Sequence, residues 1–505
     1  MGDNGPAMAN EIELKLALPE SAQRALLRHP ALLEAAGRLG TQLVSVYYDT
    51  PDLTLHRRGI ALRLRRQSGA WLQTIKCSGR DEGGLTSRPE WETPYSGHFD
   101  FSPIDDQAIR EYLERPRIRR HLVPLFETRF RRTTWQFEGL QLMLDRGWIV
   151  SSGRREAISE IELELSQGHA SSLFALAERL AARLPLTPAM LSKAERGYRL
   201  YQQLPSAPSK AGDLPMDGKA LAQLPPLAVF RIIAFACMTH MQSNHAGAIL
   251  SDDPEYIHQM RVAVRRLRAC LRLFAPLLAP QFAETVLPPL RALMGRLGEV
   301  RDLDVLLSEI VGPVVAALPD EPRLAALAGI VTDRRHGARL ETAKALQSAH
   351  YGQMLLRLAA LLHQETETDN EAQAPVTVSD FTAEQLQRLT RKVRKLARGA
   401  DPGDPASLHA LRIGIKRLRY ALEFFAPLAD GKNRRQAASQ LADIQATLGQ
   451  LNDLANAGRL LMDCAGDDLH LREAVTLVGG WHGPHHTWLQ EQIPPLLTKL
   501  WRLAR

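Results

Sequence analysis

The first two hundred residues alternate between polar and apolar positions, and this pattern predicts β-strands. In EIELKL, residues 11–16, every second side chain is charged and the others are Ile or Leu. Similar alternation recurs in ALRLRR (61–66), TRFRR (128–132), LQLMLD (140–145) and EIELEL (160–165). Because successive side chains of a strand point to opposite faces, each segment has one apolar and one charged face.

Beyond residue 204 the apolar residues follow helical spacing, and the segments are rich in Leu, Ala and Arg. Residues 204–226 contain five prolines among Ser, Gly and Lys, which is typical of a linker. A polar stretch at 364–375 divides the C-terminal part. We therefore expect a multi-domain α+β chain, with an extension at 1–10, a sheet domain at 11–203, a linker at 204–226 and an all-helical domain at 227–505, in halves of about 227–363 and 376–505.

The helical part contains an internal repeat. HQMRVAVRRLRACLRLF begins at His258, and HALRIGIKRLRYALEFF begins 151 residues later, at His409. LGEVRDLDVL at Leu297 and LGQLNDLANA at Leu448 keep the same separation of 151 residues. Two motifs with one separation indicate two similar halves packed into one helical bundle.

The charges on the polar strand faces are sorted by strand, with carboxylates on the first and last strands and guanidiniums on the middle ones. A half-buried sheet with a solvated face is the simplest alternative, but such a face tends to mix charge signs and neutral polar residues. Sorted charges suit a polyanion held with divalent cations, because aligned carboxylates hold Mg²⁺ or Mn²⁺ and arginines clamp phosphoryl oxygens. Such a site needs a closed or concave sheet whose apolar faces are covered by helices or loops.

On a helical wheel, each repeated helix carries a basic stripe opposite an apolar one. A solvated face is the alternative, but the first stripe holds no acid between His258 and Phe274, and the second has only Glu423. Stacked like charges destabilise a helix, so we expect a bound anion to compensate. The predicted anion-binding residues are His258, Arg261, Arg265, Arg268, Arg272, His409, Arg412, Lys416 and Arg419.

The net charge of +7 favours an anionic partner but does not identify it, because nucleic acid, membrane surfaces and phosphate compounds are all anionic. The basic stripes lack interleaved aromatic residues for base stacking, so we do not expect a nucleic-acid partner. No apolar run is long enough to cross a membrane. The four cysteines form no CxxC pair, which argues against a disulfide framework and favours a cytoplasmic protein.

Residues 11–203 resemble the CYTH family, also called triphosphate tunnel metalloenzymes. The resemblance rests on ExExK at residues 11–15, followed in order by YYDTPDLTLHRRGIALRLRR, LQTIK, RPEWE, TRFRR, EIELEL and SKAERGY. It implies an antiparallel barrel that forms a tunnel, and Mg²⁺- or Mn²⁺-dependent hydrolysis of inorganic triphosphate. The implied metal ligands are Glu11, Glu13, Asp145, Glu160, Glu162 and Glu164. The implied phosphate-binding residues are Lys15, Arg63, Arg65, Lys76, Arg129, Arg131 and Lys193.

The roles within this tunnel are only partly assigned by the sequence. A carboxylate such as Glu162 could orient or activate the attacking water. Either Lys76 or Lys193 could support the leaving oxygen, and the sequence leaves the choice open. Glu90 is a further candidate for a tunnel carboxylate. The chain contains no GxxxxGK[ST] loop, so a P-loop enzyme is excluded.

Residues 227–505 resemble the CHAD domain, a helical domain named for its histidines. The motif HxxRxxxxRLR occurs in both repeats, and LGxxxDL, with Asp302 and Asp453, resembles its companion motif. The resemblance implies a basic surface that binds inorganic polyphosphate. Arg301 of the first companion motif is replaced by Asn452 in the second, so the two repeats need not bind equally.

These patterns predict a cytoplasmic inorganic triphosphatase with an attached polyphosphate-binding domain, which could associate with polyphosphate granules. A non-catalytic polyphosphate scaffold is one alternative, although binding alone would not need the tunnel carboxylates. A thiamine triphosphatase or an adenylyl cyclase of the tunnel family is another. A cyclase needs a base-recognition pocket, and no feature of the sequence supplies one.

Overall fold

The computed structural model describes residues 9–67, 69–212, 214, 218–368, 377–428 and 432–503. The chain forms two compact units, one of Met1–Ala207 with Gln347–Glu367 and one of Pro208–Leu346 with Thr368–Arg505. The first unit holds the predicted strands and the second is helical. No helix within the described ranges has both the length and the apolar character that a membrane crossing requires.

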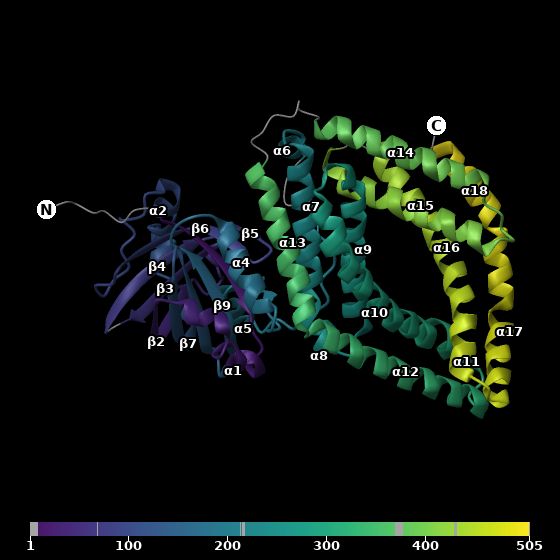
Figure 1. Ribbon diagram of the computed structural model, residues 1–505, viewed down its shortest axis with the longest axis horizontal. Helices are drawn as coiled ribbons and strands as arrows, with labels where there is room; N and C mark the ends of the chain where they lie inside the picture. Colours follow the sequence, from purple (N-terminus) through teal and green to yellow (C-terminus); the bar gives the residue numbers. More distant parts are fainter. Residues whose placement is uncertain are drawn as a thin grey trace. The chain divides into compact units, whose positions relative to one another are not determined.

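Eight antiparallel strands of the N-terminal unit form a closed barrel (Figure 1). Their order is β1–β9–β8–β7–β2–β3–β4–β6, and β6 pairs with β1 to close the ring, while β10 and β5 extend the sheet beside β1 and β6. The predicted antiparallel barrel is confirmed. The strands are β1 Ala9–Ala17, β2 Gly37–Asp49, β3 Ile60–Gln67, β4 Ala70–Cys77, β5 Arg80–Glu82, β6 Leu85–Pro94, β7 Val123–Phe137, β8 Leu140–Ser151, β9 Arg154–Leu165 and β10 Thr187–Pro188.

Helices and loops cover the outside of the barrel, as its apolar outer faces require. Helix α4 (Ala170–Ala181) packs against β1 and β9 and buries Leu173 and Ala177 completely. A second cluster surrounds Trp91 on β6 and includes residues of α2 (Gln107–Leu113) and α3 (Pro116–Arg119). The short helix α1 is Gln23–Leu26. With the apolar faces covered, the charged faces of the strands line the interior.

Helix α5 (Lys193–Tyr201) contacts β7, β8 and β9 and belongs to the barrel core. Tyr198 packs edge-on against Phe126 at 5.1 Å between ring centroids, in a cluster with other apolar residues of the strands. The helix starts after Ser192, whose side chain accepts a hydrogen bond from the Glu195 backbone N–H. This start places the Lys193 side chain among the interior charges.

Helix α13 (Ala349–Thr368) belongs to the N-terminal unit, although it lies within the range expected for the helical domain. His363 stacks on Phe174 of α4 at 5.1 Å, and its Nε2 lies 3.1 Å from the carbonyl oxygen of Glu82. At Gly352 the two backbones approach so closely that an added Cβ would lie 1.8 Å from the carbonyl oxygen of Leu186. The helix is therefore part of the packing around the barrel.

The second unit is built from helices, which confirms the predicted helical region. In it α9 packs against α7 and α10, and α15 packs against α14 and α16, so the two repeated helices have similar neighbours (Figure 1). Both start in the same way, with Asp253 or Asp404 as N-cap followed by proline. The helices are α6 Gly218–Ala222, α7 Pro226–Ser243, α8 His245–Leu250, α9 Pro254–Leu273, α10 Leu287–Val305, α11 Gly312–Ala317, α12 Pro322–Leu346, α14 Val378–Arg398, α15 Pro405–Phe424, α16 Lys432–Ala465, α17 Leu469–Glu491 and α18 Ile493–Leu503.

The close approach at Gly352 gives a prediction about stability. Gly352→Ala should destabilise the N-terminal unit by about 1–3 kcal/mol, because α13 must move away from Leu186 to accept a methyl group. Hydrogen exchange in α4 and α13, together with urea unfolding, measures the effect. The control is Gly337→Ala in α12, where nothing lies within 4 Å of the added Cβ. Gly337→Ala should stabilise α12 by up to about 1 kcal/mol. Equal destabilisation by both changes would contradict the close packing of α13 against Leu186.

Candidate active site and a second basic cavity

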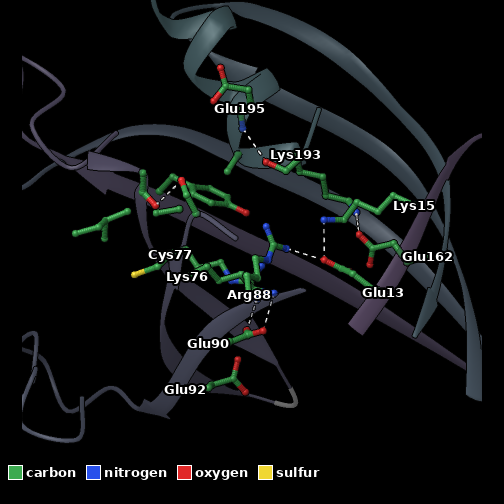
Figure 2. A pocket seen from close by; sticks show the side chains of 18 of the residues that line it. Glu13, Lys15, Lys76, Cys77, Arg88, Glu90, Glu92, Glu162, Lys193 and Glu195 are labelled. Atoms are coloured by element: carbon green, nitrogen blue, oxygen red, sulfur yellow. Dashed lines mark hydrogen bonds and ion pairs between the residues drawn. The ribbon is translucent and has the colours of Figure 1, made fainter. Parts of the chain in front are cut away.

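A cavity of about 710 Å³ lies inside the barrel, and its lining is dominated by charged side chains (Figure 2). They come from six barrel strands, β1, β3, β4, β6, β7 and β9, and from α5, so segments far apart in the sequence meet at one place. Many of the carboxylates and cations are paired with each other, such as Glu13 with Arg88 and Glu90 with Lys76. The described charged residues that line the cavity include Glu13, Lys15, Arg63, Arg65, Lys76, Arg88, Glu90, Glu92, Arg132, Glu162, Glu164, Lys193 and Glu195.

Three buried carboxylates, Asp145, Glu160 and Glu162, form a cluster in the barrel interior. One ligand oxygen of each lies within 4.8 Å of the others. They meet because Asp145 and Glu160 are register partners on β8 and β9, and Glu162 follows two residues later on the same face. Only Glu162 of the three also lines the cavity, so it connects the cluster with the open space.

Two cations balance this acidic cluster. The Lys193 Nζ lies 2.7 Å from Asp145 Oδ2 and 2.8 Å from Glu162 Oε1, and it also pairs with Glu160. The Arg132 guanidinium pairs with Asp145 at 2.7 Å and with Glu162. Burial disfavours the charged form of Glu162, but Lys193 and Arg132 outweigh it and hold the pKa of this carboxyl well below its usual value. Glu162 is therefore ionised at neutral pH.

The donor set of the cluster is consistent with a divalent metal ion. Three carboxylates from adjacent strands direct oxygen atoms to one place, which is the ligand chemistry that Mg²⁺ and Mn²⁺ prefer. Among the other predicted ligands, Glu164 lines the cavity, and Glu13 pairs with Lys15 at 2.7 Å and with Arg88 at 2.8 Å. The side chain of Glu11 lies outside the described residues.

The cations of the cavity are crowded on the side of β3 and β4. Arg63 lies 3.5 Å from a carboxylate oxygen of Glu90, and Lys76 lies 2.7 Å from the other. Arg65 donates a hydrogen bond to Ser45, but no carboxylate among the described residues lies within ion-pair distance of it. Burial, reinforced by the nearby Arg63 and Arg132, lowers the pKa of Arg65 to about 10. It is charged at neutral pH, and the neighbouring Arg63 and Arg132 disfavour that charge.

The structure places most predicted phosphate-binding residues in this cavity but corrects two of them. Lys15, Arg63, Arg65, Lys76 and Lys193 line it. Arg129 and Arg131 are exposed on the outside of the barrel, where Arg129 pairs with Glu127. The inward arginine of that strand is Arg132. Both faces of TRFRR carry arginine, so the alternation alone did not identify the inner face.

Arg88 is another functional candidate that the sequence analysis missed. It alternates with Glu90 and Glu92 on β6, and all three line the cavity. The signal was present in RPEWE, because Arg88 shares a strand face with Glu90, which was recognised. Arg88 holds the buried carboxylate of Glu13, so it fixes the position of the first strand's acid.

The helical unit contains a second cavity, of about 640 Å³, between α9 and α15 and bordered by α10 and α16. Arg419, a predicted anion-binding residue, is not among the residues that line this cavity; it pairs with Glu423 at 3.5 Å and stacks over Tyr420. Arg417 lines the cavity in its place. The other predicted residues all lie in this cavity, namely His258, Arg261, Arg265, Arg268, Arg272, His409, Arg412 and Lys416.

The second cavity has more positive than negative charge, and its cations repel one another. Burial, with Arg265 and Arg412 nearby, lowers the pKa of Lys416 to about 7. The two repeats also differ. Burial and Arg301 lower the pKa of His258, whereas a ring nitrogen of His409 lies 2.9 Å from Asn452 Oδ1. Asn452, which stands where the first repeat has Arg301, therefore gives His409 different surroundings from those of His258.

The balance between Lys193 and the acidic cluster gives a second prediction. Lys193→Gln should destabilise the N-terminal unit by about 3–5 kcal/mol in the presence of EDTA, because three buried carboxylates lose a shared cation. Millimolar Mg²⁺ or Mn²⁺ should restore part of the lost stability if the cluster binds metal. Thermal unfolding measures both effects. As a control, Arg179→Gln removes an exposed ion pair with Glu34 and should change the stability little. If Mg²⁺ or Mn²⁺ restores none of the stability lost in Lys193→Gln, the cluster does not bind metal.

Comparison with known proteins agrees with this geometry. The family profile of the CYTH domain matches residues 9–198, and that of the CHAD domain matches residues 232–462. An inorganic triphosphatase from Haemophilus influenzae is 32% identical over 197 residues, which are 38% of this chain and 55% of that protein. The chain thus spans about half the length of that relative.

Two further relatives extend the comparison to the helical unit. An uncharacterized protein from Mycobacterium tuberculosis is 27% identical over 450 residues, 82% of each chain. The crystal structure of the CHAD domain from the plant Ricinus communis has a TM-score of 0.50 and 32% identity, and the match covers 58% of this chain and 96% of that chain. The chain therefore contains a CYTH domain at residues 9–198 and a CHAD domain at residues 232–462.

Proposed function

We propose that the N-terminal unit hydrolyses inorganic triphosphate to diphosphate and phosphate with Mg²⁺ or Mn²⁺, and that the helical unit binds inorganic polyphosphate. One observation supports the enzymatic part most directly. A single cavity joins the ionised Glu162 of the carboxylate cluster to the crowded cations Arg63, Arg65 and Lys76. A linear polyanion together with a divalent cation would satisfy both sides, because the phosphates would neutralise the cations and the metal ion would offset the repulsion between the phosphates and the carboxylates.

The chain's own residues account for most of the proposed chemistry. Arg63, Arg65 and Lys76 bind the phosphates and reduce the repulsion that an approaching water would meet. Glu162 can accept a hydrogen bond from that water and orient it toward the phosphorus. A divalent cation at the cluster would supply further charge neutralisation and lower the pKa of the water. Because Lys193 is held by three carboxylates, Lys76 is the better candidate to support the leaving diphosphate.

The lining of the cavity favours an inorganic substrate over a nucleotide or a thiamine ester. An organic base needs an accessible aromatic face or an apolar slot. Tyr47, Trp91 and Tyr198 are the Phe, Tyr or Trp residues among the described lining residues, and each is at most 4% exposed. Their rings are packed into the clusters around the barrel and do not offer a stacking surface. The ring of His56, which also lines the cavity, packs against Tyr198 and pairs with Glu195. The similarity to a Haemophilus inorganic triphosphatase agrees with this choice.

The enzymatic proposal predicts that Glu162→Gln lowers triphosphate turnover by about 10²- to 10⁴-fold. The amide keeps the shape of the side chain but cannot carry the negative charge. Phosphate release from triphosphate, with Mg²⁺, with Mn²⁺ and with EDTA, measures the effect. Glu127→Gln is the matched control, because that carboxylate pairs with Arg129 outside the barrel. Wild-type protein that releases no phosphate with either metal would favour the non-catalytic scaffold instead.

The polyphosphate part of the proposal rests on unsatisfied donors in the second cavity. Among the described residues, the Nε atoms of Arg261, Arg268 and Arg412 are buried and have no hydrogen-bond partner in the protein. A buried donor without a partner costs about 1–3 kcal/mol. Phosphate oxygens are suitable acceptors for guanidinium groups, and a polymer brings many of them. The lowered pKa of Lys416 is consistent with cations arranged for a ligand that the protein itself does not supply.

Removing one arginine from each repeat should weaken polyphosphate binding. We expect Arg261→Ala combined with Arg412→Ala to lower the affinity at least about tenfold and to reduce the slope of log K against log salt by about one to two. Binding titrations of the full chain at several salt concentrations measure both quantities. The control combines Lys344→Ala with Arg459→Ala, two exposed cations outside the cavity that remove the same charge. Equal losses in the two double variants would show that only net charge matters.

A further inference from the structure

The packing of α9 against α15 has an internal symmetry that the charges break. Because the repeats are 151 residues apart, Arg266 corresponds to Arg417, and Arg272 corresponds to Glu423. On one side of the helix pair, Arg266 Nη1 lies 2.7 Å from Glu423 Oε2, which is an ordinary ion pair. The equivalent residues on the other side are Arg417 and Arg272, two cations.

The protein does not balance the charge on this second side. Neither Arg272 nor Arg417 has a carboxylate within ion-pair distance among the residues that the structure describes. The Nε of Arg417 is buried and has no hydrogen-bond partner there. Burial, together with Arg268 and Arg417, lowers the pKa of Arg272, which shows that the two arginines repel each other. The arrangement lacks an anion.

A groove of about 280 Å³ lies on this side, bordered by α9, α14 and α15. Arg272 and Arg417 line it, and Arg388 and Lys392 reach it from α14, one helical turn apart. No acidic residue is among its described lining residues. Arg272 and Arg417 also line the 640 Å³ cavity, so the groove adjoins it.

We propose that this groove, the α14 groove, is a second phosphate-binding subsite into which a long polyphosphate chain continues from the main cavity. The proposal rests on the polyphosphate binding proposed above for the helical unit. Phosphate oxygens would supply the acceptors and the negative charge that the contact between Arg272 and Arg417 lacks. A linear polymer is the ligand class, because one chain can occupy two adjoining cavities at once. Affinity should therefore rise with chain length beyond the length that fills the main cavity.

The test compares affinities for a series of narrowly sized inorganic polyphosphates in the full chain. Arg388→Ala with Lys392→Ala removes the two cations that belong to the groove alone. We expect this variant to bind short chains like the wild type and to lose about five- to tenfold in affinity for long chains, with a salt slope lower by about one to two. The tunnel contributes equally in every variant, because no change lies in the N-terminal unit.

The matched control is Arg391→Ala with Lys395→Ala, which removes two exposed cations from the same helix outside the groove. It should keep the gain of affinity with chain length. The proposal is overturned if the groove variant keeps that gain while Arg261→Ala with Arg412→Ala loses binding, or if the control loses as much as the groove variant. If all three double variants bind polyphosphate of every length like the wild type, polyphosphate binds elsewhere on the chain and the groove proposal fails. If the wild type binds no polyphosphate of any length, the polyphosphate function itself fails.

Discussion

Charge burial inside a closed barrel is the constraint on which the N-terminal unit depends. A barrel whose outer faces are apolar must turn its alternating charged residues inward, where an unpaired charge is costly. The structure meets that cost by pairing, with Lys193 and Arg132 among the three carboxylates, and Arg88 beside Glu13. The same pairs keep the carboxylates ionised, so the interaction that stabilises the fold also prepares the oxygen ligands for a cation.

The helical unit handles buried charge differently. Its two repeated helices present their cations to a shared cavity, and the carboxylates there are too few to balance them. The cost is visible in the lowered pKa of Lys416 and in the buried guanidinium nitrogens without partners. The barrel thus balances most of its buried charges internally, whereas the helical cavity keeps an excess of cations.

Periodicity predicted the strands, and the helical wheel with the 151-residue spacing predicted the two basic helices, whereas the barrel and its lining residues were implied by the resemblance to the CYTH family. It could not decide which face of β7 is internal, since Arg131 and Arg132 are chemically equivalent and only barrel closure distinguishes them. It also placed α13 with the helical domain, because the packing of Gly352 against Leu186 joins residues far apart in the chain. Arg419 was expected in the cavity on its wheel position, but its neighbour Glu423 holds it outside.

The two helical repeats show how small changes give a symmetric framework an asymmetric surface. The common N-caps, buried faces and helix neighbours of α9 and α15 keep the framework alike. The first repeat has Arg301 where the second has Asn452. The neighbour of His258 is therefore a cation, whereas His409 contacts a neutral amide. The second repeat has Glu423 at the position of Arg272 in the first repeat. Glu423 forms an ion pair with Arg266 on one side of the helix pair, and the equivalent residues on the other side, Arg417 and Arg272, are both cations. On the cationic side, Arg272 and Arg417 line both the shared cavity and the α14 groove, so the basic lining extends beyond the cavity there.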